Sequence, residues 1–293
     1  MDGVTFAGRV AVVTGAGGGL GRAHARLLAE RGAKVVVNDI GLTQNISSAR
    51  NVVAEISERG GEAVADVHDV ETEAGTTAII QTALDSYGRI DIVVGNAAVR
   101  VRSAFTDCER ADLTRLMEVN VGGTWGVTQA AWPHMCERGY GRVVVTTSGA
   151  GLFGSQQNVA YAASKSALIG MMRSLAFIGA PSGIMVNALS PGAWTPSFAA
   201  ASAGADADRR AFYEENWPPE LVSPVVAALC HERCPITGEI ISAIGGHISR
   251  VFVAETVGMD VDGDFSAEYF LNHLGRVIAE RGYHVPGAKP VIA

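Results

Sequence analysis

The chain has 293 residues, of which 48% are hydrophobic and 18% are charged, so it is long and apolar enough to bury a large core. Its net charge of -7 excludes an extended basic surface for nucleic acid or acidic lipid. No apolar run reaches the roughly 18 residues of a membrane span, and the first residues lack a signal-peptide pattern. We therefore expect a cytoplasmic protein that acts on small molecules and contacts neither membrane nor nucleic acid.

Short runs rich in β-branched residues alternate along the chain with longer segments of helical periodicity. The predicted strands cover residues 9–14, 34–38, 62–67, 91–94, 142–147, 183–189 and 239–243, and the clearest predicted helices cover 19–31, 47–59, 72–87 and 159–178. This alternation is typical of right-handed βαβ units, and strands that are apolar throughout are typical of a sheet covered on both faces. The sequence predicts an α/β fold with a doubly wound, parallel, seven-stranded sheet.

A glycine-rich stretch, TGAGGGLG, follows the first predicted strand and opens the first helix. Glycines at Gly15, Gly18, Gly19 and Gly21 let the backbone turn tightly and approach a pyrophosphate, and the start of a helix attracts an anion. Together with Leu20, these glycines are predicted to bind the phosphates of a dinucleotide.

The second predicted strand ends in Asp39, within the run VVVNDIG. A lone aspartate at such a position is usually a solvated strand end. After a glycine loop, however, a carboxylate here is expected to accept hydrogen bonds from the adenosine ribose and to repel the 2′-phosphate of NADP. Gly18 offers no side chain to hold that phosphate. The sequence therefore favours NAD as the cofactor.

Four polar residues in the middle of the chain are candidates for catalysis. Tyr161 and Lys165 lie four residues apart in a helical pattern, which places them on one face, where a nearby cation favours a phenolate. Ser148, at the end of the fifth strand, is placed to donate a hydrogen bond to a substrate oxygen, and Asn120 to hold a water for proton relay. Each residue alone also fits an ordinary structural role.

Residues 194–217 are predicted to form a substrate loop. Within them, residues 197–208 are small and lack a periodic face, which indicates a mobile loop or lid. The aromatic residues of this segment could enclose an apolar ligand or pack against the core: Trp194, Phe198, Phe212, Tyr213 and Trp217.

The pattern changes after Gly246, so we divide the chain into a main domain, residues 1–246, and a C-terminal extension, residues 247–293. A helix is predicted from Ser266 to Arg281, with Ser266 as its N-cap and Gly282 as its stop. This extension covers the core of its own domain, contacts a neighbouring subunit or forms a wall of the substrate site. The thiols and imidazole of residues 230–234 lack a second ligand pair, so no metal site is predicted.

The motifs from about Gly8 to Gly246, in this order and spacing, resemble the short-chain dehydrogenase/reductase family. The resemblance rests on TGxxxGxG at the glycine loop, Asp69-Val70, Asn96-Ala97, Asn120, Ser148, Tyr161-x-x-x-Lys165 and Pro191-Gly192. It implies a Rossmann fold, an NAD(P) cofactor, oxidation or reduction at a secondary alcohol or ketone, and a homodimer or homotetramer.

The resemblance also implies a role for each catalytic candidate. Tyr161 would act as acid and base, and Lys165 would promote its ionisation and bind the nicotinamide ribose. Ser148 would orient the substrate oxygen, and Asn120 would anchor a relay water.

Further residues are assigned to the cofactor by the same resemblance. Asp69 and Val70 would face the adenine, with Asp69 preferred over Asp66 because Val70 follows it. Asn96 and Ala97 would line the cofactor by their backbone.

The family pattern changes near the nicotinamide. Pro191 and Gly192 would contact the cofactor, but the usual threonine five residues after the proline is Pro196, and Thr195 stands one position earlier.

Several longer strings, including VVVNDIG and GRIDIVV, resemble the (3R)-hydroxyacyl-CoA dehydrogenase domain of peroxisomal multifunctional enzyme type 2. This closer resemblance implies a 3-hydroxyacyl-CoA substrate and a role in lipid metabolism. A dehydrogenase for hydroxysteroids or other bulky secondary alcohols is the alternative enzyme, and a non-catalytic NAD-binding protein is the alternative of another class. Arg100 and Arg102 either meet the phosphates of CoA or are solvated.

Overall fold

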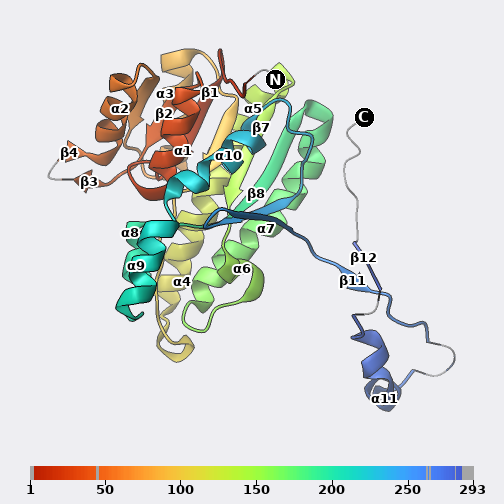
Figure 1. Ribbon diagram of the computed structural model, residues 1–293. Coiled ribbons are helices and arrows are strands. Elements are labelled where there is room, and N and C mark those ends of the chain that lie inside the picture. Colours follow the sequence, from red (N-terminus) through yellow and green to blue (C-terminus); the bar gives the residue numbers. More distant parts are fainter. Residues whose placement is uncertain (1–2, 44–45, 262, 264, 281, 286–293) are drawn as a thin grey trace.

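A central sheet organises the computed structural model, which describes residues 3–43, 46–261, 263, 265–280 and 282–285 (Figure 1). The eight strands, in spatial order, are β10 (His247–Val251), β9 (Ile240–Ile244), β8 (Ile184–Gly192), β7 (Gly141–Thr146), β6 (Ile92–Gly95), β1 (Val10–Thr14), β2 (Lys34–Asn38) and β5 (Glu62–Asp66). All neighbours pair in parallel except β9 and β10. The predicted Rossmann-type α/β fold is confirmed.

The predicted count of seven strands is one too few. The seven parallel strands lie where the sequence places them, and β10 adds an eighth, antiparallel edge strand. Gly245 and Gly246, with φ of 53° and 82°, form the tight turn that returns the chain beside β9. The glycine pair was the available signal for this hairpin.

Helices cover both faces of the sheet (Figure 1). One face packs against α1 (Gly19–Glu30), α2 (Ser48–Glu58) and α10 (Ser223–Cys230). The other packs against α3 (Glu73–Tyr87), α5 (Gly123–Arg138) and α7 (Val159–Gly179). Successive residues of β1 enter the two cores alternately, because side chains point to opposite faces of a strand.

Shorter elements connect these layers. They are β3 (Leu42–Thr43), β4 (Ile46–Ser47), η1 (Phe105–Asp107), α4 (Arg110–Leu116), the π-helical segment η2 (Met117–Gly122), α6 (Gly149–Phe153), η3 (Ala180–Ser182), α8 (Pro196–Ala201), α9 (Ala207–Asn216) and η4 (Pro219–Leu221). The expectation that residues 197–208 form a loop is therefore wrong for most of that segment. Thr195 and Asp206 accept backbone N–H groups at the two helix starts, and the alanines between favour helix.

The C-terminal extension continues from β10 into a two-stranded ribbon, β11 (Glu255–Thr256) with β12 (Tyr283–His284), and α11 (Ala267–Val277). Ser266 caps α11 as predicted, but the helix ends before Ile278, and the predicted last residue, Arg281, lies outside the described residues. Figure 1 shows α11 well apart from the sheet. Throughout the described residues, no helix combines the length and apolarity needed to cross a membrane.

Candidate active site

A pocket of about 460 Å³ lies where the carboxyl ends of β1, β2, β6, β7 and β8 meet. Ligands of open α/β sheets bind at this edge. The pocket brings together most of the predicted site residues: Gly15, Gly18, Gly19, Leu20, Gly21, Asp39, Asn96, Ala97, Ser148, Tyr161, Lys165, Pro191 and Gly192. Asn120, Asp69 and Val70 do not line it.

The backbone of the glycine loop lets a ligand group approach it closely. Gly15 has a φ of 62°, and a Cβ there would lie 2.7 Å from the Cα of Ala97. No side chain caps the start of α1 at Gly18, so the first N–H groups of the helix remain available to an anion. These features fit the pyrophosphate of a dinucleotide.

Thr14 and Asn96 hold the loop against the neighbouring strand end. The Asn96 Nδ2 donates to the carbonyls of Thr14 at 3.0 Å and Gly15 at 3.2 Å. In return, the Thr14 Oγ1 accepts the N–H groups of Asn96 at 3.0 Å and Ala97 at 3.1 Å. Asn96 thus acts through its side chain as well as through its backbone. Sequence reasoning treated Thr14 only as part of the motif.

Asp39 lies at the nucleotide end of the pocket and supports the glycine loop. Its Oδ2 accepts the Gly17 N–H at 2.9 Å, and its Oδ1 accepts the Gly41 N–H at 2.7 Å and the Ser48 hydroxyl at 2.8 Å. An ionised carboxylate has about four acceptor positions, so one remains for a ribose hydroxyl. The structural role of Asp39 and its partner Ser48 were missed by the sequence reasoning.

The two aspartates considered for the adenine have different surroundings. Asp66 is buried and accepts hydrogen bonds from Asn38, His68 and Thr82. Asp69 is half-buried, and its carboxylate accepts the N–H of the residue two positions later. Buried Asp66 is therefore committed to joining β2 and α3, whereas Asp69 keeps acceptor capacity. The adenine contacts of Asp69 and Val70 stay predictions.

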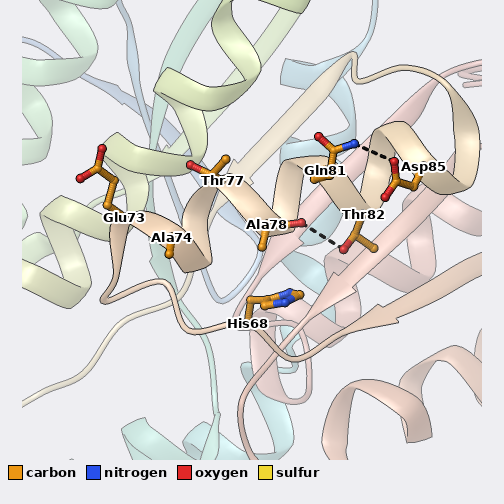
Figure 2. A pocket seen from close by; sticks show the side chains of 8 residues that line it. All are labelled: His68, Glu73, Ala74, Thr77, Ala78, Gln81, Thr82 and Asp85. Atoms are coloured by element: carbon orange, nitrogen blue, oxygen red, sulfur yellow. Dashed lines mark hydrogen bonds between the residues drawn. The ribbon is translucent and has the colours of Figure 1, made fainter.

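A second groove, of about 670 Å³, lies beside α3 (Figure 2). It is larger than the candidate active site but contains none of the predicted site residues. Three of its polar side chains are already hydrogen-bonded: Gln81 donates to Asp85 at 2.6 Å, and Thr82 donates to Asp66 and to the Ala78 carbonyl. We assign no chemistry to it.

Tyr161, Lys165 and Ser148 meet at the other end of the pocket. Tyr161 is 8% exposed, and the Lys165 Nζ lies 5.9 Å from the centroid of its ring. Burial, with a smaller contribution from the Arg100 charge, lowers the pKa of Lys165 to about 7. Its ammonium donates to the Thr146 carbonyl at 2.8 Å.

Ser148 lies two residues after the end of β7 and caps α6. Its Oγ accepts the Ala150 N–H at 3.2 Å, which leaves the hydroxyl proton free to donate into the pocket. This geometry is suited to orienting a substrate oxygen.

Asn120 is fully buried in the π-helical segment η2, behind the pocket. Its side-chain amide accepts the Val99 N–H at 2.8 Å and donates to the Val99 carbonyl at 3.1 Å and to the Ser164 hydroxyl at 3.0 Å. The amide therefore holds the segment that follows β6, and a role in proton relay stays a prediction.

Neither Arg100 nor Arg102 is merely solvated. Arg100 lines the pocket, with its guanidinium carbon 4.5 Å from the centroid of the Tyr161 ring. Arg102 donates to the Gln157 side chain at 2.8 Å and to the Ala201 carbonyl, so it joins the residue-157 turn to α8.

The helices α8 and α9 form a lid that is held by its own aromatic residues. Phe198 lies 5.4 Å from Tyr213 and 5.8 Å from Trp217, centroid to centroid. Phe198 alone among the five aromatic residues of this segment lines the pocket. Thr195 also lines it, but its hydroxyl accepts the Phe198 N–H as the cap of α8, so contact with a nicotinamide stays a prediction.

Comparison with known proteins places these motifs in a family. The family described as short chain dehydrogenase matches residues 9–207. A short-chain type dehydrogenase/reductase of Mycobacterium tuberculosis is 41% identical over 286 residues, which cover 96% of this chain and 98% of that protein. Peroxisomal multifunctional enzyme type 2 of Drosophila melanogaster is 38% identical over 258 residues, which cover 86% of this chain but 42% of that enzyme.

Solved structures agree with these matches. The full-length Drosophila enzyme superposes with a TM-score of 0.79 at 31% identity, over 97% of this chain and 48% of that one. A 7α-hydroxysteroid dehydrogenase in complex with NADH gives a TM-score of 0.74 at 30% identity, over 84% of this chain and 98% of that one. A gluconate 5-dehydrogenase structure with bound NADP gives a TM-score of 0.74 at 31% identity, over 83% of this chain and 98% of that one.

Proposed function

We propose that this chain, which belongs to the short-chain dehydrogenase family, is an NAD-dependent enzyme that interconverts a secondary alcohol and a ketone. Its proposed substrate is a 3-hydroxyacyl-CoA. The observation that carries the proposal is the single pocket that joins the glycine loop to Ser148, Tyr161 and Lys165. When bound, the nicotinamide would accept the hydride that leaves the carbinol carbon.

The residues at the catalytic end supply proton transfer and orientation. In the oxidative direction, the Tyr161 oxygen takes the hydroxyl proton of the substrate while Ser148 donates a hydrogen bond to the same oxygen. Lys165 adds positive charge beside Tyr161, which stabilises the ionised phenol. The low exposure of Tyr161 keeps bulk water from this exchange.

The assignment of NAD rather than NADP rests on Asp39. Its carboxylate borders the pocket, and a 2′-phosphate would meet a negative charge there. Similar structures hold either NADH or NADP, so fold alone does not choose between them. Titration of the purified protein with each dinucleotide should give tighter binding of NAD; tighter binding of NADP would contradict the assignment.

The 3-hydroxyacyl-CoA assignment is supported by similarity to the multifunctional enzymes, of which the chain spans less than half the length. The similarity in structure to a 7α-hydroxysteroid dehydrogenase supports the alternative of a bulky alcohol substrate. An NADH-release assay over 3-hydroxyacyl-CoAs, steroid alcohols and simple secondary alcohols separates the two. Activity confined to alcohols without CoA would exclude the first choice.

Replacement of Tyr161 by Phe tests whether the protein is an enzyme at all. Because the variant lacks the proton-accepting oxygen, we expect its turnover to fall by about 10²- to 10⁴-fold with unchanged NAD affinity. A non-catalytic NAD-binding protein would show no turnover in either form, and normal turnover of the variant would refute the assigned chemistry.

We further propose a cytoplasmic homodimer or homotetramer. Two exposed apolar features support assembly: the groove of α5 and α7 lined by Trp125, Trp132 and Ile178, and the extension, where Leu271 is 67% exposed. The part of the extension that follows β10 would then cover a neighbouring subunit, and the mass in solution checks this assembly.

A further inference from the structure

Arg100 is held at the catalytic end of the pocket by buried structure. It follows Val99, whose N–H and carbonyl are both bound by the Asn120 side chain, at 2.8 and 3.1 Å. Asn120 is itself fixed by the Ser164 hydroxyl and is fully buried. The backbone that presents Arg100 is therefore rigid, although no strand or helix contains it.

The guanidinium of Arg100 lies against the face of Tyr161, with 4.5 Å between its central carbon and the ring centroid. This contact orients the guanidinium but satisfies none of its N–H groups. The Nε is buried without a hydrogen-bond partner, and across the described residues no carboxylate forms an ion pair with Arg100. A donor withdrawn from water and left unpaired is unfavourable, which indicates that a ligand completes the site.

Among the described residues that line the pocket, no carboxylate pairs with Arg100. Asp39 is the carboxylate among the pocket residues, and three donors already hold it beside the glycine loop. At the catalytic end, the Arg100 guanidinium and the Lys165 side chain, whose pKa is lowered to about 7, both lie beside Tyr161. This end of the pocket therefore carries uncompensated positive charge next to the residue that must meet the reacting oxygen.

We propose that Arg100 is a specificity-determining residue that binds an acyl oxygen of the substrate, two carbons away from the reacting carbinol. This inference rests on the proposed dehydrogenase function and names the part of the substrate that the pocket recognises. The bound oxygen belongs either to the carbonyl of a 3-hydroxyacyl thioester or to the carboxylate of a free 3-hydroxy acid. Both present an acceptor to the fork of guanidinium donors.

The position of Arg100 beside Tyr161 favours an acceptor that the substrate supplies. In the proposed reaction Tyr161 would face the carbinol oxygen, so a group that touches both Arg100 and the tyrosine ring would lie within a few bonds of that carbon. A plain secondary alcohol has no second oxygen there and leaves the guanidinium unpaired. Charge-assisted hydrogen bonds of this kind contribute about 10- to 100-fold in affinity.

The test compares kcat/KM of matched substrates in the 293-residue protein. For chain lengths of 4, 8 and 12 carbons, the 3-hydroxyacyl-CoA, the free 3-hydroxy acid and the 2-alkanol are assayed with wild type, Arg100→Met and Arg100→Lys. Arg110→Met, which removes an exposed arginine at the start of α4, is the control for loss of a positive charge. NAD affinity is measured for every variant.

We expect Arg100→Met to lower kcat/KM by about 10- to 100-fold for the substrate whose acyl oxygen is bound, and by less than about 3-fold for the 2-alkanol. Arg100→Lys should recover part of the loss, more for the acid than for the thioester, because it keeps charge without the planar fork. Whichever acyl substrate shows the greater dependence on Arg100 identifies the source of the oxygen.

Equal losses on alcohols and acyl substrates would show that Arg100 only supports Tyr161 and would overturn the inference, as would a selective loss of NAD affinity. If the wild type turns over the acyl substrates and Arg100→Met has the same kcat/KM for them, the inference is overturned and the proposed function stands. If the wild type oxidised no member of the panel and reduced none of the corresponding ketones, the proposed function would fall and the inference with it.

Discussion

Acid should weaken the packing of α1 on α10 through one buried imidazole. His24 of α1 is 1% exposed, its Nδ1 lies 2.8 Å from the Ser223 Oγ, and its Nε2 has no partner. Burial lowers the pKa of His24 from 6.5 to about 3. Because the folded pKa lies below the unfolded one, the unfolded chain binds more protons between these values, and stability falls as the pH falls from about 6.5 to about 3.

The size of the effect follows from these two pKa values. Between pH 7 and pH 5, the His24 contribution favours unfolding by a factor of about 25, or about 2 kcal/mol. Urea unfolding of the cofactor-free protein at pH 7, 6 and 5 measures the loss. Carboxylates also titrate in this range, so the informative quantity is the difference between wild type and His24→Gln, in which position 24 takes up no proton.

We expect His24→Gln to lose about 2 kcal/mol less than wild type between pH 7 and pH 5. His247→Gln, which removes an exposed imidazole from β10, should follow the wild-type curve. Parallel curves for wild type and His24→Gln would refute the reasoning, because they would mean that His24 is hydrated or already protonated in the folded protein.

Three other changes test the site. In Gly21→Ala the new Cβ would clash with the Gly15 carbonyl of the glycine loop, so NAD affinity, measured by fluorescence titration, should fall by about 10- to 100-fold. The control is Gly275→Ala, where the space around the glycine is open and NAD affinity should stay unchanged. Because the pKa of Lys165 is lowered to about 7, its contribution to stability should become more favourable from about pH 7 to pH 10. Lys165→Met should therefore be more stable than wild type at pH 6, with an advantage that shrinks by pH 10, and a constant difference would contradict this. Arg102→Met removes the hydrogen bonds that hold α8, so thermolysin should cut residues 196–216 about 5-fold faster, and equal rates would show that the bonds are not limiting.

The parts of the site that the sequence predicted are those with local signatures. A spacing of four on a helix brings Tyr161 and Lys165 together whatever surrounds them. A glycine loop between strand and helix likewise carries its own geometry, and the carboxyl ends of parallel strands necessarily meet at one edge. For this reason the pocket contains nearly every residue predicted to line it.

Long-range contacts were not predictable in the same way. Nothing near Asn120 in the sequence indicates that its side-chain amide is hydrogen-bonded to the backbone of Val99. Likewise, nothing near Arg100 indicates that its guanidinium contacts the ring of Tyr161. The lid was read as a loop because its apolar residues pack on each other across two short helices, which gives no periodic face against a core. These contacts depend on the folded chain rather than on a motif.

The three hydrogen bonds that Asp39 accepts also limit how this protein can change during evolution. A substitution that removed its charge to admit NADP would at the same time release the Gly17 N–H, the Gly41 N–H and the Ser48 hydroxyl. A substitution at Asp39 therefore changes the cofactor preference and the stability of the glycine loop at the same time. A lineage that switched cofactor would need compensating changes at the start of α2, and the pairing of residues 39 and 48 is expected to vary jointly among its descendants.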